Sequence, residues 1–174
     1  MESFRELALK RQSCRNYDGN PVPDALLNEI VGTALLAPSA RNLQPWKLHI
    51  VTGDAAKRIF KEAMADHGFN AWGSACPALI VIESDVRANT RLGYTYDFPT
   101  VDAGILMAYI TLAAAEKGLG TCIVGAEDEG KIKQILGISD EKRIYCSVAV
   151  GWPADANVRE KSRKAFEEAV VCRS

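Results

Sequence analysis

The sequence has few of the groups that most hydrolases and metalloenzymes use. It contains only two histidines, His49 and His67, and its five cysteines are scattered and form no Cys-x-x-Cys pair. His49 alternates with apolar residues in a candidate strand and His67 falls near a helix end, so both are predicted to be structural or surface groups. A zinc site, a disulfide framework and a Cys-His or Ser-His-Asp nucleophile are therefore disfavoured. The cysteines in or beside apolar stretches are predicted to be small buried residues: Cys76, Cys122 and Cys146.

A strong charge of one sign and a long hydrophobic run are also lacking. The formal net charge is −1, which gives no support for a nucleic-acid or anionic-membrane partner. The longest apolar run, Ala103 to Ala115, is shorter than the roughly 20 residues of a membrane span and predicts a buried helix. The first residues include acids and lack the apolar segment of a secretory signal. We expect a cytoplasmic protein and, with 174 residues that are 48% hydrophobic, a single domain over 1–174.

Nucleotide-binding motifs built on glycine are missing as well. The sequence has no Gly-Lys-Ser/Thr phosphate loop. Gly118, Gly120 and Gly125 follow a candidate helix, whereas a dinucleotide fingerprint needs a strand before its glycines and a helix directly after them. Asp128 and Glu129 stand at the start of a predicted helix, where acids serve as cap and dipole partners. We therefore expect neither a Rossmann site nor a catalytic carboxylate pair.

Apolar periodicity predicts interspersed helices and strands. Strands are predicted over 47–52, 78–82, within 118–126 and over 144–152. Helices are predicted over 2–10, from Pro23 to a stop at Pro38, after Gly53-Asp54, from a cap at Thr100 or Asp102 to Lys117, and up to Gly137. The helix that ends at Lys117 has little polar surface and is predicted to lie at the centre of the fold. Segment 85–98 has no clear period, and its aromatic residues are consistent with either a cover over a pocket or ordinary packing.

The segment 37–46, which reads A-P-S-A-R-N-L-Q-P-W, combines conformational restriction with short polar side chains. Pro38 and Pro45 fix their own φ and disfavour helix at the residue before each of them. Ser39, Asn42 and Gln44 offer donors and acceptors that could hold a ligand. Taken alone, the segment is better described as a helix-to-strand loop that is closed by prolines and anchored by a tryptophan than as a ligand site.

Two cationic clusters stand near opposite ends of the chain, Arg11 with Arg15 and Lys161 with Arg163, and each alone would be a solvated surface patch. Together with three other motifs they resemble the nitroreductase family of FMN oxidoreductases. The five motifs, in order, are R-x-S-x-R, P-S-A-x-N-x-Q-P-W, D-A-G-I-L, G-L-G-T-C-I-V-G-A and K-S-R, and they cover nearly the whole chain. The resemblance implies an α+β, nitroreductase-like fold, in which helices flank a mixed, mostly antiparallel sheet around a central buried helix.

The resemblance also implies a set of FMN contacts. The phosphate is expected to be held by Arg11, Lys161 and Arg163, with Ser13 and Gln12 as further partners. Arg15 is expected near the pyrimidine edge of the flavin, where a cation stabilises the negative charge of the reduced ring. The backbone at Val124 and Gly125 is expected to face the reactive ring nitrogen, and glycine permits close approach there.

In this family the segment 37–46 acts across the interface of an intertwined homodimer. The residues implied to touch the partner's flavin are Pro38, Ser39, Ala40, Asn42 and Gln44. The implied reaction passes hydride from NAD(P)H through FMN to a small acceptor such as a nitroaromatic or a quinone. Because the cofactor carries this chemistry, we assign no catalytic residue.

The sequence departs from the family pattern in two places. Many relatives have a lysine and an asparagine before the second strand to hold the pyrimidine ring, whereas segment 69–74 offers only Asn70. Little chain lies between Glu83 and Asp102 to cover a pocket. The acceptor therefore stays open, and two alternatives remain. One is a flavin enzyme with another reaction, such as dehalogenation, ring dehydrogenation or flavin fragmentation, and the other is a non-catalytic flavin-binding or sensory dimer.

Overall fold

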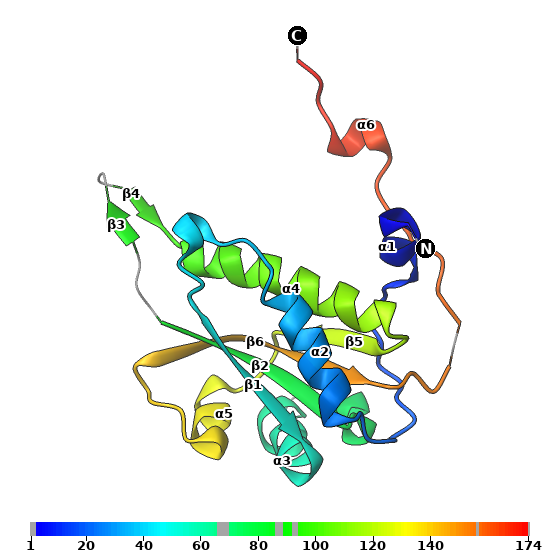
Figure 1. The fold of residues 1–174 in the computed structure, drawn as a ribbon, viewed down its shortest axis with the longest axis vertical. Coiled ribbons are helices and arrows are strands. Elements are labelled where there is room, and N and C mark those ends of the chain that lie inside the picture. The colour runs from blue at the N-terminus through cyan, green and yellow to red at the C-terminus, as the bar shows by residue number, and fades with distance from the viewer. Residues whose placement is uncertain (1–2, 66–69, 86–88, 92–93, 156, 174) are drawn as a thin grey trace.

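A four-stranded sheet with helices on both faces forms the centre of the protein (Figure 1). The computed structural model describes residues 3–65, 70–85, 89–91, 94–155 and 157–173. One face carries α2 (Asp24–Ala34) and α4 (Phe98–Glu116). The other carries α3 (Gly53–Ile59), its π-helical continuation (Phe60–Met64) and α5 (Glu129–Leu136). The short α1 (Phe4–Lys10) packs against α4. The predicted α+β class is confirmed.

The strands of the sheet follow the order β1 (Trp46–Thr52), β2 (Ala78–Asp85), β6 (Lys142–Gly151) and β5 (Gly120–Val124). Every neighbouring pair in this order is antiparallel, and a bulge interrupts the β2–β6 register between Ile82 and Glu83. Among the described residues, parallel pairing occurs only in the isolated bridge between Ser13 and Thr121. The parallel part of the predicted mixed sheet is therefore limited to the segment that follows α1.

Strand β2 lies between two hydrophobic cores. Leu79, Ile80, Val81 and Ile82 are all 0% exposed. Ile80 and Ile82 pack with α2 and α4, whereas Leu79 and Val81 pack with α3 and α5. A strand that is covered on both faces needs a continuous apolar run, because each of its alternating side chains enters a core. The sequence-based prediction for this strand is confirmed.

Helix α4 begins earlier than the sequence predicts. Its N-cap is Asp97, whose carboxylate accepts a hydrogen bond from the Thr100 backbone at 3.3 Å, and Pro99 occupies the first turn, where its missing N–H costs nothing. The predicted caps, Thr100 and Asp102, lie inside the helix. With a mean hydropathy of 1.5 over its apolar window, α4 passes the length and composition test for a membrane span, but half of that window is buried. Its contacts with α2 and the sheet make it the core helix that was predicted.

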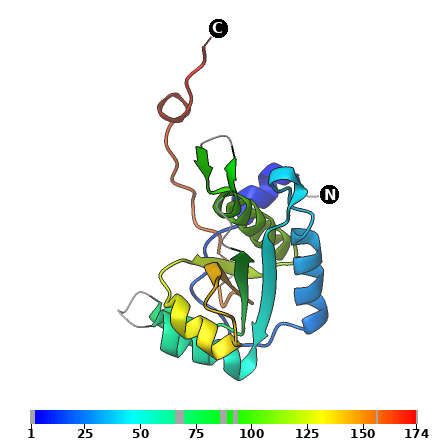
Figure 2. The same ribbon diagram turned by 90° about the vertical axis from the view of Figure 1, so that its left-hand side faces the viewer.

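Two segments project from the side of the molecule where α1 and α4 lie (Figures 1 and 2). One is the ribbon formed by β3 (Asn89–Arg91) and β4 (Tyr94–Tyr96), which lies in the segment with no clear period. The other is the C-terminal tail, which carries the short α6 (Phe166–Ala169) away from the body. Phe166 and Val171 in this tail are 66% and 78% exposed. A tail that exposes such apolar side chains leaves surface for a partner to cover.

Candidate functional site

The residues that follow α1 are tied to the residues that follow β6. Gln12 donates from its Nε2 to the Asn157 carbonyl at 2.8 Å, and its Oε1 accepts from the backbone N and the Nε of Arg159 at 3.1 and 3.2 Å. Lys161 donates from its Nζ to the Arg11 carbonyl. The two cationic segments, which lie about 150 residues apart in the chain, therefore form one structure.

Positive charge accumulates where these segments meet. The cluster consists of Arg11, Arg159, Lys161 and Arg163. Partial burial lowers the pKa of Lys161, and the nearby charges of the three arginines lower it further. No carboxylate within the described ranges forms an ion pair with any of the four. A concentration of unpaired cations is unfavourable by itself and becomes favourable when an anion binds. The cluster therefore has the donors and the charge to hold a phosphate.

Arg159 is a member of this cluster that the sequence-based prediction did not include. Its Nη2 donates to the Ser13 carbonyl at 2.6 Å. Residues 159, 161 and 163 are all basic, and a spacing of two in a non-helical segment places side chains on the same side. That alternation in R-E-K-S-R was the signal in the sequence. Arg163 itself donates to the Ser162 carbonyl at 2.6 Å, so its guanidinium remains next to the cluster.

The predicted Ser13 and Arg15 lie on a segment that runs beside β5. The backbone N of Cys14 donates to the Thr121 carbonyl at 2.7 Å. The Cys14 side chain covers Gly120, where an added Cβ would come within 2.6 Å of the Cys14 Cβ. Glycine at this position therefore permits the close approach. Arg15 is exposed and lines a hollow together with Gln12, Ser13, Cys14, Asn16, Pro153, Asp155, Asn157 and Arg159.

The predicted backbone contacts at Val124 and Gly125 lie at the far end of β5. Val124 is four residues beyond Gly120, or about 13 Å along the strand. Asn70 is buried, and its Nδ2 donates to the carbonyls of Ala126 at 2.9 Å and Met64 at 3.2 Å. The amide group of Asn70 therefore supports the loop that follows β5.

The loop that contains Pro38, Ser39, Ala40, Asn42 and Gln44 has an unusual backbone. Arg41, Asn42 and Gln44 have φ values of 55°, 56° and 47°, which cost on the order of 1 kcal/mol or more for each non-glycine residue. Two hydrogen bonds hold this conformation. The buried Asp102 carboxylate of α4 accepts from the Ala40 backbone N at 2.9 Å, and the Ser39 hydroxyl accepts from the Gln44 backbone N at 2.9 Å. An ordinary connecting loop does not need such strain.

The structure does not bring this strained loop to the cation cluster within one chain. The loop is held by Asp102 in the second turn of α4, whereas Arg11 and Gln12 line a hollow with Ala115 at the other end of that helix. Ala115 is thirteen positions after Asp102 in the helix, which corresponds to roughly 20 Å. The strained loop and the cation cluster therefore lie at opposite ends of α4.

Other polar residues have structural roles. His49 Nε2 lies 2.6 Å from a carboxylate oxygen of the nearly buried Glu83, while His67 lies outside the described residues. Asp128 caps α5 by accepting from the Lys131 backbone N at 3.0 Å, as predicted for an acid at a helix start. Cys76 and Cys122 are buried as expected, and Cys146 is half-buried.

The antiparallel α+β fold carries a cation cluster beside its edge strand β5, and this cluster has the charge and donors of a site for an anionic small molecule. Comparison with known proteins identifies the family. The sequence profile of the Nitroreductase family matches residues 8–152, which is most of the chain. The chain therefore belongs to the nitroreductase family, as its motifs predicted.

Individual proteins agree with this assignment. The NADH dehydrogenase of Thermus thermophilus is 31% identical, and the alignment covers 85% of each chain. The solved nitroreductase family protein of Streptococcus pneumoniae TIGR4 has a TM-score of 0.86 at 22% identity and covers 98% of this chain and 100% of that chain. An FMN-dependent nitroreductase of Clostridium difficile R20291 has a TM-score of 0.69 at 25% identity, with 93% and 92% covered. The nitroreductase-like fold is confirmed.

Proposed function

We propose that this protein is an FMN-dependent NAD(P)H oxidoreductase that passes hydride from NAD(P)H through bound FMN to a small acceptor such as a nitroaromatic or a quinone. The observation that carries the proposal is the cation cluster assembled from both ends of the chain. Its members include the residues of the R-x-S-x-R and K-S-R motifs, and no described carboxylate pairs with them. Membership of the nitroreductase family is the second support.

The residues of the cluster fit the phosphate of FMN. Arg11, Lys161 and Arg163 supply charge-assisted donors, and Arg159 adds a fourth cation. Gln12 and Ser13 add polar groups on the segment that Arg159 fixes. Gly120 lines a hollow with Arg11 and Gln12, and the 13 Å or so from Gly120 to Val124 matches the scale of a mononucleotide that extends along β5. The phosphate end and the ring end of the ligand can thus both be placed on one strand.

The ring end is then held by Arg15 and by the backbone at Val124 and Gly125. Arg15 is exposed in the hollow beside the cluster, where its guanidinium favours negative charge on the flavin pyrimidine. Gly125 has no side chain to prevent close approach of the ring to the loop. Bound FMN supplies the hydride chemistry. The chain itself binds, orients and tunes the cofactor, so the proposal assigns no catalytic residue.

We also propose that the protein works as a homodimer with FMN at the subunit interface. The loop that contains Pro38, Ser39, Ala40, Asn42 and Gln44 contacts one end of α4 and the cation cluster of the same chain lies at the other end, roughly 20 Å along the helix. A second copy packed across α4 would bring its own loop to this cluster. The surface available for that packing exposes several large apolar side chains. Its exposed residues on and near α1, α2, α4 and the tail include Phe4, Leu36, Leu43, Val101 and Phe166.

The first test is the visible spectrum of the purified protein, followed by titration with FMN. We expect a yellow protein with flavin absorbance, or an apoprotein that quenches FMN fluorescence on binding. A colourless protein that takes up no FMN would overturn the proposal. NADH and NADPH are then added separately without oxygen, and bleaching by either identifies the hydride donor. The acceptor is found by adding nitrobenzenes and quinones to the bleached protein. Bleaching without turnover of either class would favour another flavin reaction.

A further inference from the structure

A buried carboxyl group lies directly beyond the loop that faces the flavin ring in the proposed function. Glu127 follows Gly125 and Ala126, and both of its carboxylate oxygens are fully buried with no hydrogen-bond partner in the part of the chain that the structure describes. The hydroxyl of Ser147 on β6 is also buried and also has no hydrogen-bond partner among the described residues. These two groups are neighbours, although they do not meet hydrogen-bond geometry. A buried polar group without a partner is costly and needs an explanation.

Among the residues that the structure describes, no positively charged group faces Glu127. The groups that face it are Ser147 and the Cys146 thiol on β6, and Glu129 in the first turn of α5. Burial raises the pKa of Glu127 to about 7, Ser147 opposes this rise, and the charge of Glu129 adds to it. Burial, and then the charge of Glu127, in turn raise the pKa of Cys146. The carboxyl is therefore neutral in mildly acidic solution and ionises at a site that disfavours its charge.

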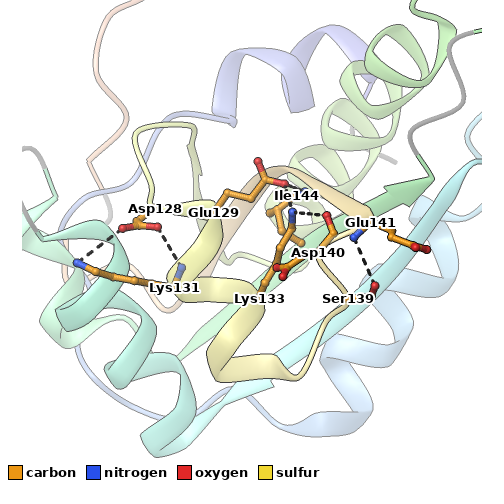
Figure 3. Close-up of polar contacts among 8 residues, drawn as sticks. All are labelled: Asp128, Glu129, Lys131, Lys133, Ser139, Asp140, Glu141 and Ile144. Carbon is orange, nitrogen blue, oxygen red and sulfur yellow. Dashed lines mark hydrogen bonds and ion pairs between the residues drawn. The ribbon is translucent and has the colours of Figure 1, made fainter.

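The loop around Glu127 is held on both sides. Val124 is paired with Ser147 in the sheet, and Asn70 donates to the Ala126 carbonyl. Beyond the loop, the Asp128 backbone N donates to the Ala63 carbonyl at 2.7 Å. Figure 3 shows the next attachment, where Glu129 accepts from the Ile144 backbone N on β6 at 2.9 Å. Glu127 is thus the unpaired member of an otherwise fixed segment, and Ser147 lies opposite the strand end that leads to Gly125.

We propose that Glu127 is a positioning residue: its neutral carboxyl, packed against Ser147, keeps the backbone at Val124–Ala126 in place for the flavin, and its ionisation loosens this loop and weakens cofactor binding. The free energy of an ionised Glu127 falls when its carboxylate moves toward water. This movement displaces the backbone residues on either side of it. The proposal rests on the proposed function for its flavin and goes beyond it in linking FMN affinity to one buried proton.

The test compares the wild type with Glu127→Gln, which is neutral at every pH. FMN dissociation constants are measured by fluorescence quenching from pH 6 to pH 9. Over this range the dissociation constant of the wild type is expected to rise on the order of tenfold more than that of the Gln variant. This factor corresponds to a difference of about one unit between the pKa of Glu127 in the free and in the FMN-bound protein. The matched control is Glu62→Gln on the helical extension after α3, where the acid is exposed and pairs with Arg58. Parallel pH profiles for the wild type and Glu127→Gln would overturn the proposal.

Ser147→Ala gives a second and independent readout. Because the Ser147 hydroxyl lowers the pKa of Glu127, its removal should move the midpoint of the affinity loss to higher pH. A purely structural effect of the substitution would change the affinity equally at all pH values and leave the midpoint in place. An unmoved midpoint would therefore contradict the proposed role, even if Glu127→Gln failed to fold.

Amide hydrogen exchange of the apoprotein separates this proposal from the proposed function. After correction for intrinsic exchange rates, peptides that cover 122–128 should lose protection between pH 6 and pH 8.5 in the wild type and keep it in Glu127→Gln. This measurement needs no flavin. A protein that binds no FMN but shows the exchange difference would refute the proposed function alone, while equal exchange in both proteins would refute the role of Glu127.

Discussion

Replacing Glu127 by glutamine should change how the stability of the apoprotein depends on pH. The unfolded chain binds this proton with a pKa near 4.5, and the folded protein binds it with a pKa of about 7 because the carboxyl is buried. A raised pKa in the folded state means that folding takes up a proton between these two values, so stability falls as pH rises through this interval. Each unit of pKa difference corresponds to roughly 1.4 kcal/mol, so the free energy of unfolding falls by about 3 kcal/mol once the pH is above 7. Below pH 4.5 the loss is absent.

The assay is urea unfolding of the apoprotein at pH 5 and pH 8, at one fixed protein concentration because association would alter the apparent stability. Wild type and Glu127→Gln should be similar at pH 5, and the variant should be more stable at pH 8 by up to about 3 kcal/mol. Glu62→Gln should follow the wild type at both pH values, since its carboxylate is exposed. If Glu127→Gln loses as much stability between pH 5 and pH 8 as the wild type, the buried carboxyl is not the source of the pH dependence.

Three further changes test the site and the interface. Arg159→Ala should weaken FMN binding by about 1–3 kcal/mol through loss of a cation and of its bonds to Gln12 and Ser13. Arg58→Ala on α3 is the control in that FMN titration and should not alter affinity. Gly120→Ala should destabilise the protein by about 1–3 kcal/mol in urea unfolding, because its Cβ would come within 2.6 Å of Cys14, whereas Gly32→Ala meets open space and should be neutral or stabilising. Val101→Glu should shift the protein toward a monomer in analytical ultracentrifugation and weaken FMN binding with it; a monomer with full FMN affinity would remove the partner's loop from the site.

The elements that the sequence predicted well are those in which local pattern and tertiary environment agree. The apolar run of β2 and the apolar surface of α4 leave no alternative to burial, and both were predicted correctly. The cap of α4 was missed because three possible cap residues, Asp97, Thr100 and Asp102, occur within six positions. The choice among them depends on Pro99, which fits the first turn, and on the attraction of Asp102 to the loop after α2.

The strained loop shows a different limit of sequence-based prediction. The prolines at 38 and 45 mark it as restricted, but neither they nor the polar residues between them indicate that Arg41 and Gln44 have positive φ. That conformation is disfavoured for both residue types. It exists because Asp102, about 60 residues further along the chain, accepts the Ala40 N–H. The conformation of the loop therefore depends on a contact with α4 that no local sequence pattern contains.

Glu127 and Asp102 are related cases. The sequence E-D-E at 127–129 predicts an acidic helix start, and Asp128 and Glu129 do serve α5 as cap and ion-pair partner. Local pattern cannot separate Glu127 from them, because the groups it meets include Ser147 and Cys146 of β6, which are distant in sequence. Asp102 likewise looks like a helix cap and is a buried acceptor. In both cases an acid that the local sequence assigns to a helix end instead supports a loop that is proposed to touch the flavin. Protonation of a buried acid next to such a loop can therefore change cofactor affinity. Asp102 accepts a hydrogen bond from Ala40, whereas Glu127 has no hydrogen-bond partner within the described residues, so Glu127 is the acid expected to have this effect.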